Sequence, residues 1–249
     1  MDGLKREIGG RGRLLYLSIG GSHAYGTSGP TSDLDFRGTF AHGRRNLLSL
    51  DAPFEGINRS EPDDLQVDPL RKLLDLGLKG KFSVAEMFFV PADQIVYRDP
   101  LVDPVLENRQ EIVSKAWFRG ILGYFNKQVE SLSAKGTGSN LGRMRREYTC
   151  GPEGDPSEQY ISPILMHAIR LGNVGLDLAE KGEVIVRRPE APFLIQVRRG
   201  EAFPRRSELV AFLQELEARL VRATERSALR EAPNRMFWSE IYRHVEESA

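Results

Sequence analysis

Two aspartates separated by one residue, Asp33 and Asp35, form the pattern in this chain that most directly indicates chemistry. The segment 33–40 alternates like a strand, so both carboxylates are predicted to point to one side, opposite Leu34 and Phe36. Neighbouring carboxylates repel each other unless a cation lies between them. Oxygen ligands without cysteine or histidine favour Mg²⁺ or Mn²⁺. A third carboxylate from a neighbouring strand would complete a two-metal site for in-line phosphoryl transfer.

A glycine-rich turn, Gly20-Gly21-Ser22, follows the apolar run 14–19, which reads as a buried strand. Such a turn offers backbone N–H groups and a hydroxyl at the start of a short helix, which suits the phosphates of a nucleotide. Each pattern alone is ordinary, because Asp-x-Asp occurs on solvated strands and Gly-Gly-Ser occurs in many turns. The conjunction is far more specific, with ten residues between Ser22 and Asp33.

This conjunction resembles the signature of the nucleotidyltransferase superfamily of DNA polymerase β, in which a Gly-Ser turn precedes Asp-x-Asp or Asp-x-Glu on the next strand. The fuller strings at 21–27 (GSHAYGT) and 32–38 (SDLDFRG) resemble, more narrowly, the RNA repair pathway DNA polymerase β family. The resemblance continues at 70–74 with Glu86, at 167–171 and at 198–201, and so spans most of the chain.

The resemblance implies a minimal five-stranded mixed sheet flanked by helices. Asp33 and Asp35 would hold Mg²⁺, and the segment 20–22, Gly20, Gly21 and Ser22, would hold the phosphates of a nucleoside triphosphate. Arg37 shares the strand face of the carboxylates, so it is expected either to pair with Asp35 or to reach a phosphate.

The family's third carboxylate lies on a later strand, and Asp64 is the preferred candidate. It begins a strand-like segment seven residues before Arg71. Asp63 would point to the other side, and Asp68, followed by a proline, is expected to cap the next helix.

His167 and Arg170 are three residues apart and share one face of a predicted helix. Two roles are possible for these residues. They either contact the triphosphate or the acceptor, or they form a buried hydrogen-bonded pair. The family pattern often has Tyr-Asp-x-Lys before this pair. Here Tyr160 is present, but Ile161 and Pro163 stand at the Asp and Lys positions, so the role of that lysine does not carry over.

Arginines gather in the second half of the chain. A basic stretch after the glycine-rich linker 134–140 could clamp RNA or triphosphate, or could be a solvated face; it contains Arg143, Arg145 and Arg146. Pairs at 187–188, 198–199 and 205–206 favour a polyanionic acceptor. No aromatic residue is adjacent to any of these three pairs as a stacking partner, so sequence-specific recognition of single strands is not supported.

The elements that must position these residues change along the chain from strands to helices. Expected strands are 14–19, 33–40, 64–67 and 94–97, with a hairpin inside 41–62. Expected helices are 22–26, 70–78, 83–89, 102–113, 116–132, 157–180, 206–224 and 236–245. We therefore expect an α+β fold, with a catalytic domain at residues 1–100 and a helical domain at 101–249.

Composition sets the outer limits. Lys and Arg number 35 and so do Asp and Glu, which excludes a polycation but allows a local basic surface. The single cysteine, Cys150, excludes an internal disulfide and a multi-cysteine zinc site. No apolar run of 18 residues and no signal-peptide core is present, so a cytoplasmic protein without a membrane partner is expected.

These patterns together predict a Mg²⁺-dependent nucleotidyltransferase that moves a nucleoside monophosphate from a triphosphate to a hydroxyl and releases pyrophosphate. The expected acceptor is an RNA 3′ end, which the resemblance and the arginine clusters favour. One alternative is adenylylation of a protein or small molecule by the same chemistry. Another is a non-catalytic nucleotide- or RNA-binding protein, although such a protein has no need for paired carboxylates.

Overall fold

The computed structural model describes residues 2–249 except 52, 62, 134–148, 151–159 and 204. The chain divides into two compact units, which we call the sheet unit (Met1–Trp117 with Arg230–Ala249) and the helical unit (Phe118–Leu229). The sheet unit therefore runs past residue 100 and takes in the end of the chain. The predicted division into domains at 1–100 and 101–249 refers to parts that fold independently, and it stays a prediction.

The sheet unit contains a mixed five-stranded sheet in the order β3-β4-β2-β1-β5. β1 is antiparallel to both β2 and β5, β2 is parallel to β4, and β3 is antiparallel to β4. The α+β class and the five-stranded mixed sheet are thus confirmed. The strands are β1 Arg13–Ile19, β2 Asp35–Ala41, β3 Ile57–Arg59, β4 Asp64–Pro69 and β5 Ile95–Arg98.

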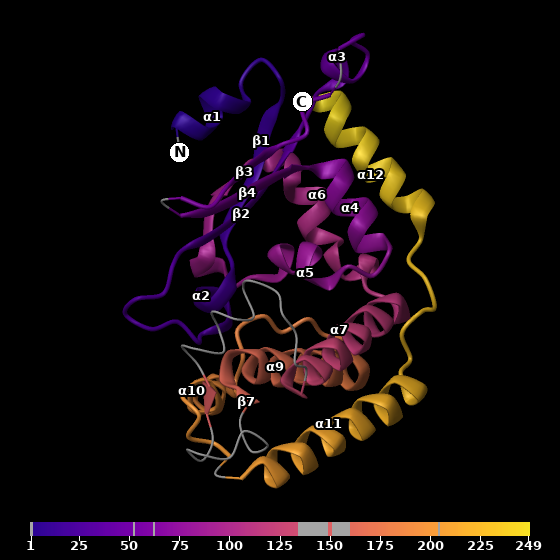
Figure 1. Ribbon diagram of the computed structural model, residues 1–249. Helices are drawn as coiled ribbons and strands as arrows, with labels where there is room; N and C mark the ends of the chain where they lie inside the picture. The colour runs from indigo at the N-terminus through magenta and orange to yellow at the C-terminus, as the bar shows by residue number, and fades with distance from the viewer. Residues whose placement is uncertain (1, 52, 62, 134–148, 151–159, 204) are drawn as a thin grey trace. The chain divides into compact units, whose positions relative to one another are not determined.

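The central strand β1 forms because its residues are apolar on both faces, and five of its seven positions are buried. On one side, Leu14, Leu17 and Phe40 pack with Ile8 of helix α1 (Asp2–Ile8). On the other side, the ring of Tyr16 lies 6.1 Å from that of Phe88. The sheet is therefore covered by α1 on one face and by later helices on the other (Figure 1).

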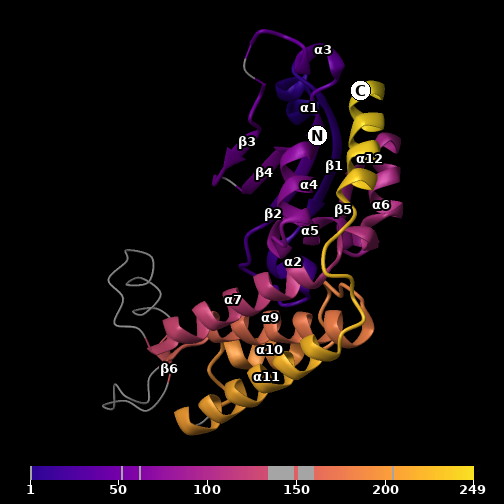
Figure 2. The same cartoon turned by 90° about the vertical axis from the view of Figure 1, so that its right-hand side faces the viewer.

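Two helices far apart in sequence pack together in the sheet unit. α4 (Leu70–Leu78) follows β4, and α12 (Arg235–Ser248) is the last helix of the chain. They lie side by side in both views (Figures 1 and 2), and Arg235 Nη2 lies 2.7 Å from Asp75 Oδ1. Asn234 caps α12, since its Oδ1 accepts a hydrogen bond from the Phe237 N–H at 3.1 Å.

The remaining short helices of the sheet unit connect these parts. The expected helix 83–89 is α5 followed by a 3₁₀ turn, and the expected helix 102–113 is broken into three short pieces. Helix α3 was not expected from sequence. The bounds are α2 Gly21–Tyr25, α3 Arg44–Leu47, α5 Phe82–Ala85, η1 Glu86–Phe89, η2 Ala92–Gln94, η3 Pro100–Val102, α6 Asp103–Glu107 and η4 Arg109–Ile112.

The expected cap at Asp68 is wrong. Strand β4 continues through Pro69, which is the N-cap residue of α4 and makes no side-chain cap hydrogen bond. The parallel ladder with β2 holds this segment extended, and the Thr39 hydroxyl donates to the Asp68 carbonyl at 3.0 Å. The Asp68 carboxylate instead accepts hydrogen bonds from Lys72 and Gln66, each at 2.7 Å.

Long helices form the helical unit around one apolar core. Gly172 and Gly175 allow α9 and α11 to approach closely, because an added Cβ would lie 2.7 Å from Leu216 and 2.6 Å from Leu220. The expected helix 157–180 begins at Ser162, after a short strand, and α10 was not expected. The elements are α7 Lys115–Ser133, which begins in the sheet unit, β6 Thr149–Cys150, β7 Tyr160–Ile161, α9 Ser162–Lys181, α10 Ala191–Arg198 and α11 Arg206–Arg226.

Candidate active site

The carboxylates of Asp35 and Asp64 lie at the starts of two neighbouring parallel strands. Asp35 is the first residue of β2, Asp64 is the first residue of β4, and the two are paired in the register of the ladder. Adjacent strands lie about 4.8 Å apart, so the two side chains can meet at this edge of the sheet. The residue chosen from sequence as the third carboxylate therefore lies beside Asp35, whereas Asp68 lies at the far end of β4.

Asp33 lies on the loop before β2, where its side chain is exposed, so the expected strand at 33–40 begins two residues late. The reason is a lack of ladder partners. The pairing of β1 with β2 ends at Ile19 and Phe36, and the last backbone hydrogen bond joins the Gly20 N–H to the Asp35 carbonyl at 2.7 Å. Asp33 is still near enough for its charge to act on Asp35.

The electrostatics of the site centre on Asp35. Partial burial raises the pKa of its carboxyl above the usual value, and the negative charges of Asp64 and Asp33 raise it further. Arg37 opposes this rise. The three carboxylates thus form one interacting group, which a cation would stabilise in its fully ionised form.

Arg37 lies between two of these carboxylates. Its Nη2 is 2.7 Å from Asp64 Oδ2 and 3.7 Å from Asp35 Oδ1, and all three side chains are between 29% and 40% exposed. Of the two roles weighed from sequence, pairing with the carboxylates is therefore the one present here. Contact between Arg37 and a phosphate stays a prediction.

The glycine turn lies against the same carboxylate. Gly20 is the N-cap residue of α2, and Gly21 and Ser22 form its first turn. Gly21 has φ +55°, and a Cβ placed on it would lie 1.7 Å from Asp35 Oδ2. Only glycine fits here, because both the left-handed backbone and the contact with the carboxylate exclude a side chain.

The donor set fits a hard divalent cation. It consists of carboxylate oxygens only, and the pKa of its central member, Asp35, is raised first by partial burial and then by the charges of Asp64 and Asp33. Within the described residues, no three Asp, Glu, His or Cys side chains are gathered tightly enough to enclose a metal ion as they stand. The guanidinium of Arg37 provides the positive charge among these carboxylates.

Residues within the family motif brace the turn. The Tyr25 hydroxyl donates to Glu86 Oε1 at 2.7 Å, which favours a packing role beneath the turn over stacking on a base. His23 Nε2 lies 3.4 Å from the Ser32 carbonyl oxygen, which agrees with a loop residue rather than a metal ligand. These contacts join the turn to the loop before β2 and to η1.

His167 and Arg170 belong to the helical unit and lie on α9. Arg170 is 2% exposed, and its Nη2 lies 3.5 Å from His167 Nδ1, while the ring of Tyr124 meets the imidazole edge-on at 5.4 Å. Burial, with a smaller contribution from the charge of Arg170, lowers the pKa of His167 to about 3. The imidazole is therefore neutral near pH 7. This geometry matches the buried pair, and a nucleotide contact stays a prediction.

Four of the arginines expected to favour a polyanionic acceptor do not provide a described surface for it. Arg143, Arg145 and Arg146 lie outside the described residues. Arg188, from one of the arginine pairs, is 2% exposed and is held by Asp177 at 2.7 Å and Glu190 at 2.9 Å. It therefore stabilises the helical unit and is not part of a surface for RNA.

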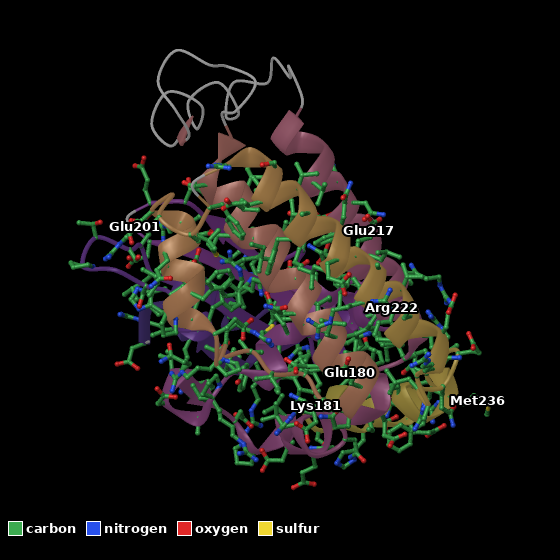
Figure 3. All side chains as sticks on the ribbon, turned by 90° about the horizontal axis from the view of Figure 1, so that it is seen from below. Glu180, Lys181, Glu201, Glu217, Arg222 and Met236 are labelled. Carbon is green, nitrogen blue, oxygen red and sulfur yellow. The ribbon has the colours of Figure 1, made fainter. Side chains whose placement is uncertain are left out.

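A cavity of about 600 Å³ lies between the ends of α9 and α11 in the helical unit. Figure 3 labels Lys181 and Arg222 from its wall, together with Glu180. Lys181 pairs with Asp177 at 2.7 Å and Arg222 with Glu215 at 3.2 Å, so nearby acids offset part of the positive charge.

Two contacts of the site could not be read from sequence. The ion pair of Arg37 with Asp64 depends on the parallel register of β2 and β4. Glu86 contacts Tyr25 across 61 positions. The resemblance to the family included Glu86, but it did not indicate what this residue does.

Part of the chain is similar to a protein of a phage. The uncharacterized 38.9 kDa protein of the nrdC-mobD intergenic region of Enterobacteria phage T4 is 26% identical to this chain over 143 residues. The match covers 53% of this chain and 42% of the phage protein, so the chain spans less than half the length of that relative.

The family match is much more extensive, since residues 4–245 match the RNA repair pathway DNA polymerase beta family. This range includes the glycine turn, the three carboxylates and both units. The description of the family points to a polymerase β-like nucleotidyltransferase of an RNA repair pathway. Because the match covers nearly the whole chain, the protein belongs to the RNA repair pathway DNA polymerase beta family.

Proposed function

We propose that the protein is a nucleotidyltransferase that uses Mg²⁺ or Mn²⁺ to transfer a nucleoside monophosphate from a triphosphate to an acceptor hydroxyl. The observation that carries this proposal is the pairing of Asp35 with Asp64 beside the Gly20-Gly21-Ser22 turn. Carboxylates on paired strands and a glycine turn in contact with them are what a metal-bound triphosphate requires. Membership of the family supports the same chemistry.

Each residue has a defined role in this proposal. Asp33 and Asp35 would hold the metal shared with the triphosphate, and Asp64 would hold the metal on the acceptor side. Bound there, the metals would neutralise charge and would lower the pKa of the acceptor hydroxyl. Ser22 and the backbone N–H groups of the turn bind the terminal phosphates and align the α-phosphate.

The reaction is an in-line displacement. The acceptor oxygen forms a bond to the α-phosphorus, the bond to the β-phosphate oxygen breaks, pyrophosphate leaves and the hydroxyl releases its proton. Arg37 lies within reach of the same carboxylates, and it moves from Asp64 to a triphosphate oxygen when the site is filled. A guanidinium suits both partners, because carboxylate and phosphate offer similar bidentate geometry.

For the acceptor we propose an RNA 3′ end. The support is the family description, which places the family in an RNA repair pathway. The charge of the chain is neutral overall, so RNA would have to be bound by local basic surfaces rather than by a general excess of positive charge.

The chemistry is tested by release of pyrophosphate with purified protein, Mn²⁺, RNA with a free 3′ hydroxyl as acceptor, and each of the four nucleoside triphosphates. We expect the double variant Asp33→Ala with Asp35→Ala, and separately Asp64→Ala, to lose activity by at least a hundredfold. Asp63→Ala is the matched control, because it removes the neighbouring carboxylate and should retain activity. Unchanged transfer in the double variant would rule out the mechanism.

The acceptor is tested separately with labelled triphosphate and three pools: RNA with a free 3′ hydroxyl, proteins and small metabolites. Label on RNA that disappears when the 3′ end is blocked supports the proposed acceptor. Label on a protein or metabolite keeps the chemistry but replaces the acceptor. Binding of triphosphate with no pyrophosphate released from any pool would indicate the non-catalytic alternative.

A further inference from the structure

A groove of about 900 Å³ lies in the sheet unit between α4 and α12, and it is closed by the segment that follows β2. Each helix contributes one face. The lining residues of α4 are Arg71, Lys72, Leu74, Asp75 and Leu78, and those of α12 are Arg235, Trp238, Ser239 and Tyr242. From Arg71 to Leu78 the groove runs about 10 Å along α4 at 1.5 Å per residue, a length and volume typical of small-molecule sites.

The cations of the groove differ in their partners, and the Glu55 carboxylate on the segment after β2 also lines it. At the far end of α4, Arg235 is neutralised by Asp75, to which its Nη2 lies at 2.7 Å. At the near end, Lys72 pairs with Asp68 at 2.7 Å. Arg71, exposed in the first turn of α4, has neither an ion pair nor a hydrogen bond with any residue that the structure describes. The groove thus has one uncommitted guanidinium, at the positive end of an α4 whose N-cap makes no side-chain hydrogen bond.

The middle of the groove is apolar and aromatic. Trp238 is 2% exposed and lies in the wall with Leu74 and Leu78. The indole Nε1–H of Trp238 is buried and finds no acceptor among the described residues. Tyr242, partly exposed, lies near Arg71, and its pKa is raised to about 12, mainly by burial and further by the carboxylate of Glu246 beside it.

The groove is separate from the carboxylates. Pro69, at the end of β4, lines the groove, whereas Asp64 begins the same strand. Five steps along a strand cover about 17 Å. A ligand in the groove therefore does not occupy the candidate active site, and the two can be filled together.

We propose that this groove is a second ligand site of the protein and that it binds a nucleoside monophosphate unit. The phosphate lies at Arg71 and the N-terminus of α4, and the base lies against Leu74, Trp238 and Tyr242. A planar ring joined to an anion matches the aromatic wall and the uncommitted cation, whereas phosphate alone leaves the apolar part of the groove empty. The unit can belong to a free nucleotide or to a strand of RNA, which share this chemistry.

The test uses the full chain with Asp33→Ala and Asp35→Ala, in EDTA, so that metal-dependent binding at the carboxylates is absent. AMP, inorganic phosphate and a short single-stranded RNA with blocked ends are titrated by calorimetry. We expect AMP to bind at least tenfold more tightly than phosphate. Arg71→Ala should weaken AMP binding at least tenfold, and Ser239→Trp, which fills the groove from an exposed position, should abolish it. Arg243→Ala is the matched control, because Arg243 is exposed on α12 but does not line the groove.

The source of the ligand follows from the two probes. AMP binding without RNA binding assigns the groove to a free nucleotide, and RNA binding that depends on Arg71 assigns it to a strand. Binding of neither probe overturns the proposal, as does AMP binding that survives both Arg71→Ala and Ser239→Trp. Because catalysis is not measured, failure here leaves the proposed transfer reaction standing.

Discussion

Replacing Gly21 by alanine separates the geometry of the glycine turn from the general stability of the protein. At φ +55° an alanine costs about 1–2 kcal/mol. Its Cβ would lie 1.7 Å from Asp35 Oδ2, so the carboxylate must leave its rotamer, at about a further 1 kcal/mol. We expect Gly21→Ala to lose about 2–3 kcal/mol of unfolding free energy, which lowers Tm by about 5–10 °C.

Activity should fall much further than stability, because a displacement of about 1 Å at a reacting centre can cost about a hundredfold in rate. Gly10→Ala is the matched control: Gly10 has φ +78° but no atom within 4 Å of an added Cβ. It should show the backbone cost of about 1–2 kcal/mol with activity unchanged. The assays are thermal unfolding and pyrophosphate release. If Gly21→Ala retains activity like Gly10→Ala, the turn does not position Asp35.

Three further changes test other parts of the structure. Arg37→Ala should tighten Mn²⁺ binding by up to about fivefold, since a half-exposed ion pair is worth about 1 kcal/mol or less. Calorimetry or electron paramagnetic resonance measures the affinity, and an unchanged value would show that the guanidinium does not compete with the metal. The free energy of unfolding should fall by about 2 kcal/mol between pH 7 and pH 5, and His167→Gln should remove this fall. The folded pKa of about 3 lies below the ordinary 6.5, so protons bind the unfolded chain first and stability falls as pH drops below 6.5; equal pH slopes in denaturant titrations would contradict this. Arg188→Met should cost about 3 kcal/mol, because it leaves the part-buried Glu190 without its cation and leaves Asp177 with Lys181 alone. A change under 1 kcal/mol by urea unfolding would contradict the buried network.

The strands and the longest helices were accessible from sequence because local pattern and tertiary burial agree there. The run from Leu14 to Ile19 is apolar on both faces, as a central strand requires. Asp68 shows the opposite case. Its Asp-Pro pair is a genuine local signal for a helix start, but pairing with Thr39 on the neighbouring strand keeps the segment extended. A local preference of about 1 kcal/mol is easily exceeded by a ladder whose partner is 29 positions away.

The candidate site was predictable in its residue types but not in its contacts. The spacing between the glycine turn and Asp35 identified two parts of the chain that meet in the structure. Asp64 was chosen because it begins a strand-like segment. The position of Asp64 beside Asp35, rather than elsewhere along the edge, follows from the parallel register of β2 and β4. Charge alone was also uninformative about Arg188, because the sequence does not distinguish a solvated arginine from one buried among carboxylates.

The route of the chain through the sheet unit has a consequence for protein engineering. The chain leaves this unit at Trp117 and re-enters it at Arg230, and the Lys115 N–H donates to the Arg230 carbonyl at 2.9 Å. Lys115 also pairs with Glu231 at 2.7 Å, so exit and return are fastened at one place. In sequence, the helical unit is thus an insertion into the sheet unit, between two chain segments that are bonded to each other. A few glycines could replace residues 118–229, and helical units from other family members could be exchanged at the same junction.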